Sequence, residues 1–229
     1  MQENRLTPRL MWFADRVRKR VLFADIGTDH AKLPVYLVKK GTVAKAIAAD
    51  IGEGPIARAR MHISAYGCDN KIETVVTDGL QGLAITPPAD IAICGMGGET
   101  ILNILAAAPL VKNADVRLLL QPMTDFALLR AYLAENGFAP IEEDIVLSEG
   151  RMYQCMVVAY CGEPYTLTAE EAELGKRCIE TRSETFLQYV KRRYAIVEKC
   201  RIGKQKANAD TAEEDALLAA YDKILKGEI

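Results

Sequence analysis

The chain has 229 residues, of which 50% are hydrophobic and 26% are charged, and its formal net charge is −2. This composition is typical of a soluble globular protein, and a chain without excess positive charge binds nucleic acid only through a local basic patch. The six cysteines form no Cys-x-x-Cys pair and there are only two histidines, so zinc-site spacing is absent and we expect no metal. The polar N-terminus shows no secretory signal, and no apolar run approaches the roughly 20 residues of a membrane span. We therefore expect a cytoplasmic protein with reduced thiols and no membrane partner.

The first predicted element is a helix that begins after Thr7, with Thr7 as its N-cap and Pro8 at its first position. Basic residues crowd this region at Arg5, Arg9, Arg16, Arg18, Lys19 and Arg20. Two interpretations stay open, namely a solvated helix face and a phosphate-contacting surface beside a ligand cleft.

Strand and helix patterns alternate from residue 21 to about residue 160. The predicted strands are 21–25, 45–49, 72–77, 90–94, 116–120, 141–147 and 153–159, and the predicted helices between them are 31–40, 54–66, 98–108 and 125–136. Such alternation indicates an α/β fold, a mostly parallel seven-stranded sheet with helices on both faces. Only residues 148–151 separate the last two strands, so these should pair as an antiparallel hairpin. We expect a doubly wound sheet finished by one reversed strand.

The pattern changes after residue 162, which divides a predicted domain 1–162 from a predicted helical domain 163–229. Capping boxes at 168–171 and 210–213 each precede an apolar stripe. The first stripe contains Ile179, Phe186, Tyr189, Val190 and Val197, and the second contains Leu217, Leu218, Tyr221, Ile224 and Leu225. Two long helices with a short polar loop predict an antiparallel coiled coil, whose exposed positions are strongly basic.

The first strand ends in a turn, Asp25-Ile26-Gly27-Thr28-Asp29, that indicates the ligand. A dinucleotide site uses Gly-x-Gly-x-x-Gly to place a pyrophosphate on the helix N-terminus. Here Asp29 takes the second glycine position, and a carboxylate repels phosphate but attracts a cation. S-adenosylmethionine carries a sulfonium and an ammonium and no phosphate, so the turn favours it over NAD. An ordinary strand–turn–helix is the alternative.

Acidic residues also end the next two strands. Asp50 can accept hydrogen bonds from both ribose hydroxyls, and Asp78 can accept from the N6 amine of an adenine. The alternatives are a helix cap for Asp50 and an Asp-Gly turn at Asp78. Because ligands of open α/β sheets bind outside the carboxyl ends of the strands, the series favours a nucleoside site.

The fourth and fifth strands end in Gly95-Met96-Gly97-Gly98 and Gln121-Pro122. The glycines allow a methyl acceptor to approach the backbone closely, although a flexible turn is the alternative. The amide of Gln121 could read a base edge. His30, within the first turn, can contact either ligand.

Together, residues 25–34, Asp50-Ile51, Asp78-Gly79-Leu80, the 95–98 segment and Gln121-Pro122 resemble the TrmK family of bacterial tRNA methyltransferases, which modify N1 of adenine 22. The resemblance covers nearly the whole chain and implies a Rossmann-like class I methyltransferase fold, S-adenosylmethionine as donor and a coiled coil that helps to hold tRNA. Lys32 departs from the family, because many members carry tyrosine there.

The expected site follows from these motifs. The cofactor-binding residues are expected to be Asp25, Gly27, Thr28, His30, Asp50, Ile51, Asp78, Gly79, Leu80 and Gly95. The catalytic residues are expected to be Asp29, Gly95, Met96 and Gln121. The RNA-binding residues are expected to be Arg5, Arg9, Arg16, Lys191, Arg192 and Arg193. We expect a monomer.

The expected reaction is an in-line displacement in which adenine N1 attacks the donor's methyl group. N1 lies on the Watson–Crick edge, so the base must be unpaired or flipped out. Other hypotheses are a methyltransferase for another RNA base or a small molecule, and a nucleoside- or RNA-binding module without turnover. A dehydrogenase is least supported, because the turn lacks the required glycines.

Overall fold

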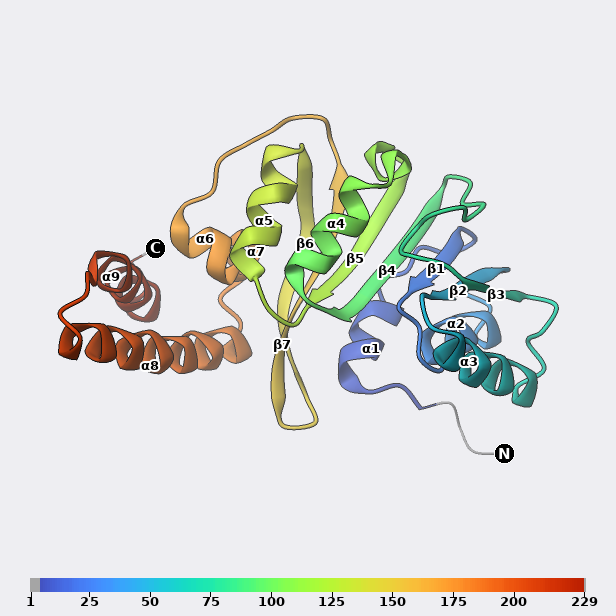
Figure 1. The fold of residues 1–229 in the computed structure, drawn as a ribbon, viewed down its shortest axis with the longest axis horizontal. Helices are drawn as coiled ribbons and strands as arrows, with labels where there is room; N and C mark the ends of the chain where they lie inside the picture. The colour runs from blue at the N-terminus through green and yellow to red at the C-terminus, as the bar shows by residue number, and fades with distance from the viewer. Residues whose placement is uncertain (1–4, 229) are drawn as a thin grey trace.

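The computed structural model describes residues 5–228, and its centre is one seven-stranded sheet in the order β3-β2-β1-β4-β5-β7-β6 (Figure 1). The strands are β1 Leu22–Ile26, β2 Ala46–Asp50, β3 Ile72–Val76, β4 Ala89–Met96, β5 Val116–Pro122, β6 Phe138–Ser148 and β7 Arg151–Tyr160. Strand β7 is antiparallel to both of its neighbours, and the other pairings are parallel. The predicted α/β fold is therefore confirmed.

The position of the reversed strand differs from the prediction. Strand β7 does not finish the sheet but lies between β5 and β6, so that β6 is the edge strand. The connection through α5 places β6 parallel to β5 and one strand further out. The tight turn after Ser148 then returns the chain into the space between them, where β7 pairs with both.

Helices cover both faces of the sheet. Helices α1 Pro8–Ala14, α2 Lys32–Lys39 and α3 Glu53–Ala65 pack on one face, and α4 Gly98–Ala106 and α5 Phe126–Glu135 pack on the other, beside a short 3-10 helix, Pro109–Lys112. Successive strand residues point to opposite faces. In β1, for example, Phe23 joins the core under α1 to α3, whereas Ala24 joins the core under α4 and α5.

The N-terminal helix is tied to the sheet by arginines. Thr7 caps α1 as predicted, since its hydroxyl oxygen accepts from Leu10 N. Arg16 pairs with Glu142 of β6, and Arg18 holds the fully buried Asp90 of β4 through a Nε–Oδ1 hydrogen bond of 2.8 Å. These two arginines therefore bind inside the protein, and an RNA contact of Arg16 stays a prediction.

One long helix after residue 168 was predicted, and this is wrong. The segment forms α6 Ala169–Leu174, α7 Lys176–Thr181 and α8 Glu184–Lys206. The helix is interrupted at Gly175, with φ +92°, and at Arg182, with φ +51°, both in the left-handed region that an α-helix cannot use. Ser183 starts α8 anew by accepting from Phe186 N.

Only one of the two predicted capping boxes forms. Thr168 and Glu171 make the reciprocal bonds at the start of α6. At α9, Ala212–Lys226, the N-cap is Thr211 instead, and Asp210 accepts from Ala212 N. The second box is wrong because Asp210 lies one residue too early and closes a local turn.

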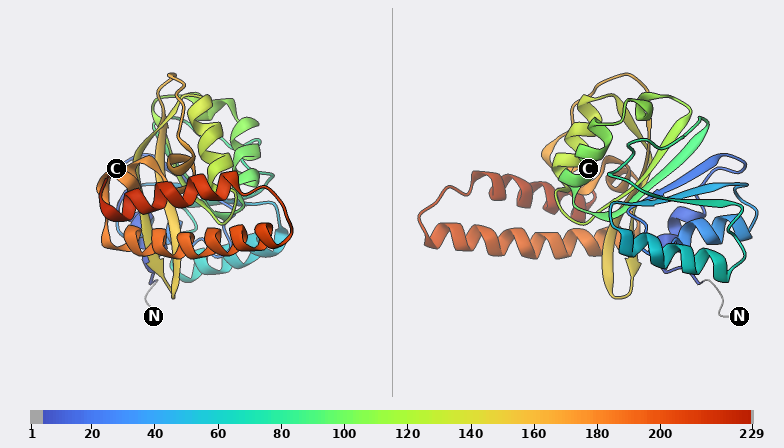
Figure 2. Two further views of the ribbon diagram at one scale, coloured as in Figure 1. Left: turned by 90° about the vertical axis from the view of Figure 1, so that its left-hand side faces the viewer. Right: turned by 45° about the vertical axis from the view of Figure 1, so that its right-hand side comes forward.

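Helices α8 and α9 form an antiparallel hairpin that extends away from the sheet (Figure 2). A third apolar cluster holds its base and combines Phe186, Tyr189 and Val190 of α8 with Tyr221 of α9 and Ile145 of β6. Since Ile145 belongs to the sheet, this cluster joins the base of the hairpin to the sheet.

Within residues 5–228, no helix combines the length and the apolar character that a bilayer crossing requires. No group of three or more histidine, cysteine, aspartate or glutamate side chains in that range is arranged to hold a metal ion. All six cysteines are free thiols.

The Arg18–Asp90 contact gives a stability prediction. Arg18→Ala leaves the Asp90 carboxylate buried without its cation, so the free energy of unfolding should fall by about 3–5 kcal/mol in urea denaturation. Lys19→Ala, at the exposed neighbouring residue, should change it by less than about 0.5 kcal/mol. An Arg18→Ala protein as stable as the Lys19→Ala control would show that the pair does not anchor α1.

Candidate functional site

The site lies at the carboxyl ends of β1 and β4, the two central parallel strands. From β1 the chain continues to β2 and β3 on one side, and from β4 it continues to β5, β6 and β7 on the other. This reversal of strand order leaves a crevice between the tips of β1 and β4, and ligands of open α/β sheets bind in such a crevice.

The first turn is fixed by backbone and hydroxyl contacts. Gly27 has φ +77°, and its N–H and that of Thr28 both donate to Ala49 O of β2, at 2.8 and 3.0 Å. The buried Thr28 hydroxyl hydrogen-bonds Asp25 and accepts from Ala31 N at 3.1 Å. Ala31 is itself left-handed, with φ +48°, and starts α2. The carboxylate of Asp25 is therefore oriented by the turn that follows it.

Gly27, directly after β1, also contacts the end of β4. The terminal methyl group of Met96 packs directly over Gly27, in the volume that a Cβ would need. Any larger residue would displace Met96 and would also be strained at this positive φ. Gly27 and Met96, both predicted site residues, thus lie together.

A cavity of about 300 Å³ opens beside this turn. Its lining includes Arg9, Asp25, Thr28, His30 and Lys32. Loss of contact with water raises the pKa of Asp25 to about 6, against the opposing effects of the Thr28 hydrogen bond and the Arg9 charge. A buried carboxylate gains most from a cation that takes the place of water, so this cavity suits a ligand with a positive group beside Asp25.

The other acidic residue of the turn has protein partners. Asp29 Oδ1 accepts from Arg58 Nε of α3 at 2.7 Å, and Asp29 Oδ2 lies 3.3 Å from His30 Nε2. Behind the turn, His62 hydrogen-bonds the backbone of His30, and its pKa is lowered by burial and by the nearby His30 and Lys32. The carboxylate of Asp29, an expected catalytic residue, is thus shared with Arg58, and His62 supports the turn from behind.

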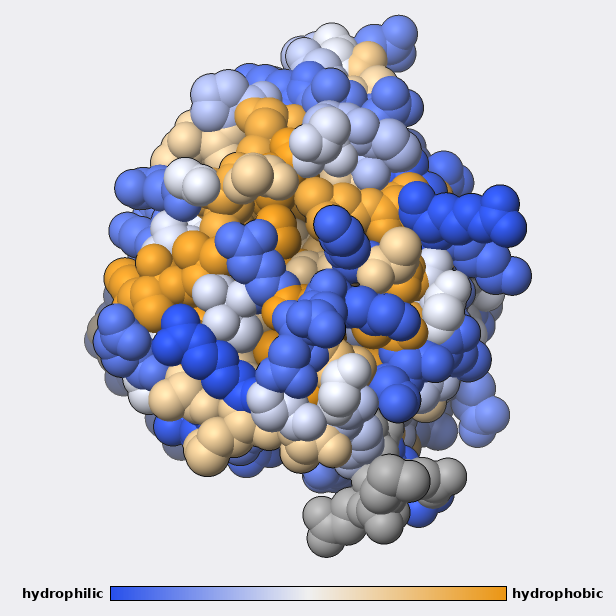
Figure 3. Space-filling model, turned by 90° about the vertical axis from the view of Figure 1, so that its right-hand side faces the viewer, coloured by the Kyte–Doolittle hydropathy of each residue, from blue (hydrophilic) through white to orange (hydrophobic). Residues whose placement is uncertain are grey.

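The end of β2 presents an acid beside an exposed apolar side chain. Asp50 Oδ1 accepts from Gly52 N at 2.8 Å, and Gly52 is the N-cap of α3. The helix-cap alternative for Asp50 is therefore right in part, because the bond orders the residues before the helix. Ile51, the next residue, is 71% exposed. Figure 3 shows the side of the molecule that carries β2 and β3, where apolar atoms lie open among charged ones.

Asp78, Gly79 and Leu80 border a second cavity, of about 410 Å³, which α4 closes on its other side. Gly79 has φ +58°, and a Cβ there would lie 3.0 Å from the side chain of Ile104. The three predicted residues at the end of β3 therefore stand next to a space that can hold a ring.

The glycines at the end of β4 and directly after it are required by the local backbone and packing, so the flexible-turn alternative does not describe them. A β-bulge separates Cys94 from Met96, and Gly95 lies in it with φ +83°. A Cβ on Gly98 would lie 2.5 Å from the carbonyl oxygen of Asp125. Burial raises the pKa of Cys94 far above its usual range, so its thiol is neutral.

Arg9 lies in the pocket, which the sequence did not indicate. Its Nη1 donates to Oε1 of the fully buried Gln121, whose Nε2 donates to Pro122 O at 2.7 Å. The Arg9 guanidinium also lies 5.1 Å from the ring centroid of Tyr153 on β7. The amide of Gln121 is thus engaged within the protein at both ends, and the charged group that reaches the pocket from this side is Arg9.

The other predicted RNA-binding residues differ in their surroundings. Lys191 and Arg192 of α8 are exposed, and so is Arg5. Arg193 forms an ion pair with Glu173 of α6. The sequence could not separate these cases, because adjacent residues on one helix point in different directions.

Comparisons with known proteins agree with this geometry. A family model described as a methyltransferase domain matches residues 6–156. The tRNA (adenine(22)-N(1))-methyltransferase of Bacillus subtilis is 34% identical over 157 residues, which cover 69% of this chain and about two thirds, 66%, of that protein. The crystal structure of a putative tRNA (m1A22) methyltransferase of Streptococcus pneumoniae in complex with S-adenosyl-L-methionine has a TM-score of 0.84 and 29% identity over 96% of this chain and 100% of that chain. The crystal structure of the B. subtilis m1A22 tRNA methyltransferase TrmK has a TM-score of 0.80 and 26% identity over 98% and 97%.

The contact between Gly27 and Met96 gives a binding prediction. Gly27→Ala should abolish detectable binding of S-adenosylmethionine in isothermal titration, because the new methyl group displaces Met96 and strains the turn. Gly41→Ala is the matched control, since Gly41 also has a positive φ, +72°, but open space around it. Unchanged binding by Gly27→Ala would exclude this turn as the cofactor site.

Proposed function

We propose that this chain, which belongs to the methyltransferase-domain family and within it to the TrmK family of tRNA methyltransferases, transfers a methyl group from S-adenosylmethionine to N1 of adenine 22 in tRNA. The observation that carries the proposal is the pocket at the tips of β1 and β4, where the half-buried carboxylate of Asp25 faces a cavity beside a glycine turn. A cationic donor fits such a pocket, and a pyrophosphate does not.

The residues at the three strand tips divide the work of holding the donor. Asp25 would take the ammonium group, Asp50 the ribose hydroxyls, and Asp78 the N6 amine of the adenine, with Ile51 and Leu80 against the ring. S-adenosylmethionine supplies a methyl group on a sulfonium, which makes that carbon electrophilic. Gly27 and Gly95 let the backbone come close to the reacting centre.

Arg9 completes the donor site in this proposal. The amino-acid part of S-adenosylmethionine has a carboxylate as well as an ammonium, and the cavity pairs a guanidinium, Arg9, with a carboxylate, Asp25. Gln121 fixes Arg9 by accepting from its Nη1. We therefore assign Arg9 to the donor and not to the RNA surface, and we assign Gln121 to the positioning of Arg9.

The acceptor base needs alignment more than acid–base chemistry. Adenine N1 has a free lone pair, so it attacks the methyl carbon without losing a proton first, and the S–CH3 bond breaks as the N1–CH3 bond forms. The ring becomes cationic, and we assign partial support of that charge to Asp29, whose carboxylate lines the pocket and is shared with Arg58. Because N1 must leave its base pair, the enzyme has to hold the base unpaired or flipped out, which costs a few kcal/mol.

The energy to hold such a base comes from contacts with the rest of the tRNA. Lys191, Arg192, Lys199 and Lys206 are exposed along α8 and can neutralise phosphates. Lys32 lines the cavity and, unlike the tyrosine that many family members carry there, offers no ring for stacking. The protein is proposed to act as a monomer in the cytoplasm, where its free thiols stay reduced.

The direct experiment is incubation of the purified protein with methyl-labelled S-adenosylmethionine and unmodified tRNA. We expect one labelled 1-methyladenine per tRNA at position 22, and no label in tRNA with guanine at that position. Label at another base would support the wider RNA methyltransferase, and tight donor binding without any label would support a binding module.

The raised pKa of Asp25 predicts how donor binding depends on pH. The carboxylate is charged above about pH 6 and protonated below it, and only the charged form attracts the ammonium. The Kd for S-adenosylmethionine should be lowest near pH 7 and should rise about tenfold per pH unit below about pH 6. Asp25→Asn should bind weakly at every pH. A wild-type Kd that stays flat down to pH 5 would show that Asp25 is not the group that binds the cation.

A further inference from the structure

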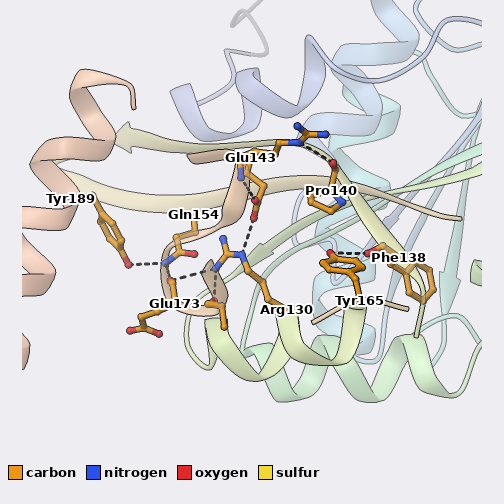
Figure 4. A network of polar contacts seen from close by, with 10 residues as sticks. Arg130, Phe138, Pro140, Glu143, Gln154, Tyr165, Glu173 and Tyr189 are labelled. Carbon is orange, nitrogen blue, oxygen red and sulfur yellow. Dashed lines mark hydrogen bonds and ion pairs between the residues drawn. The ribbon is translucent and has the colours of Figure 1, made fainter. Parts of the chain in front are cut away.

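A buried ion pair joins the methyltransferase part to the C-terminal helices (Figure 4). Arg130 of α5 and Glu143 of β6 are 2.8 Å apart, Nε to Oε1, and both side chains are almost completely buried. The second carboxylate oxygen of Glu143 accepts from Arg177 N, at the start of α7, at 3.0 Å. One carboxylate thus connects α5, β6 and α7.

The same arginine also holds the end of α6. Arg130 Nη1 donates to the carbonyl oxygens of Ala172 and Glu173 in the last turn of that helix, at 3.1 and 3.4 Å. A cation is favourable there, because the carbonyl groups at a helix C-terminus carry partial negative charge. Arg130 therefore fixes α6 relative to the sheet.

From α6 the contacts continue to α8. Gln154 of β7 donates to Glu173 O at 3.0 Å and to the Tyr189 hydroxyl oxygen at 2.9 Å. The Glu173 carboxylate forms an ion pair with Arg193. Two residues of α8, one turn apart, are thus held through α6 to the Arg130–Glu143 pair.

Gly175 makes this arrangement possible. A Cβ there would lie 2.7 Å from Glu143 Oε1 and 2.8 Å from Arg130 Nη2, and the residue has φ +92°. Among the described side chains, Arg130 Nη2 and Gln154 Oε1 are buried without a hydrogen-bond partner. A network that leaves polar atoms unpaired is poorly suited to maximise stability, and a buried pair of this kind can instead select one geometry.

The orientation of α8 at its base matters because the helix is long. Helix α8 has 23 residues, and it contacts β6 at its base and α9 along its length. Such a helix is about 35 Å long, so a rotation of about 10° at the base moves the far end by about 6 Å. Figure 2 shows this end standing clear of the sheet. The direction of the basic surface of α8 therefore depends on the contacts at its base, which are the apolar cluster and the polar network that leads from Arg130 and Glu143.

We propose that Arg130, Glu143 and Gly175 form a rigid joint that aims the helical hairpin relative to the donor pocket and thereby positions bound tRNA without touching it. The proposal rests on the proposed function, since it assumes that the α8–α9 hairpin and the residues around the donor pocket bind the same tRNA molecule. Two contact surfaces held at a fixed distance and angle make the second contact intramolecular, and a loose joint lowers its effective concentration.

The test uses Glu143→Gln in the full-length protein, which keeps the shape of the side chain but removes the charge. The KM for tRNA, and the Kd for tRNA with S-adenosylhomocysteine bound, should each rise about tenfold. The Kd for S-adenosylmethionine and kcat at saturating tRNA should change by less than about twofold, because the pocket itself is intact. A merely structural role would instead affect all of these quantities together.

Glu180→Gln is the matched control. It removes the charge from the exposed Arg177–Glu180 pair of α7, at 2.9 Å, which lies next to the joint but outside it. Its tRNA KM should equal that of the wild type. If Glu143→Gln does not unfold cooperatively, Tyr189→Phe, which removes the acceptor for Gln154, is judged by the same criteria with an expected rise of about threefold.

The outcomes separate the two proposals. A folded joint variant with an unchanged tRNA KM, or with donor binding and kcat reduced as much as tRNA binding, overturns the joint while the wild type still methylates tRNA. A wild type that neither binds nor methylates tRNA overturns the proposed function, and the joint with it.

Discussion

The structure depends on one constraint, the parallel pairing of β1 with β4 at the point where the chain changes direction across the sheet. Parallel pairing puts the carboxyl ends of five strands on one edge, and the reversal keeps the connecting loops from crossing the crevice between the two central strands. Only glycine tolerates both the turn at position 27 and the packing of Met96 upon it. From this arrangement follow the placement of the three strand-end carboxylates and the position of the glycines after β4.

Much of this was predictable, because the signals were local. Short apolar runs that lead into aspartate or glycine predicted the first four strands. Thr7-Pro8 and Thr168 to Glu171 predicted helix starts that the structure confirms. The errors came from non-local effects. Gly175 looks tolerable in a helix until Arg130 and Glu143 occupy the space around it, and nothing in the sequence of β7 says that it enters the sheet between β5 and β6. Arg9 was placed on a surface because its partner Gln121 is 112 residues away.

The chain is nearly neutral as a whole, but its acidic and basic side chains are unevenly distributed between the pocket and the α8–α9 hairpin. The pocket contains the half-buried carboxylate of Asp25, whose pKa is raised because the protein shields it from much of the water. The hairpin carries exposed lysines and arginines, while Arg201 and Lys204 pair with acids of α9 across the hairpin. In the proposed function, the same residue types therefore serve the donor, the RNA and the internal packing, and only their partners distinguish them.

The ties of α1 have a consequence for synthesis of the protein on the ribosome. Arg18 can pair only after Asp90 has been synthesised, and Arg9 only after Gln121. Arg16 needs Glu142, which lies 126 residues further along. These contacts span 72 to 126 residues, and contacts of such long sequence separation form slowly because of the entropy of loop closure. A nascent chain that stops before β6 has the glycine turn but lacks Glu142 and Tyr153, which contact Arg16 and Arg9. The proposed donor pocket is therefore expected to form only when most of these residues have emerged.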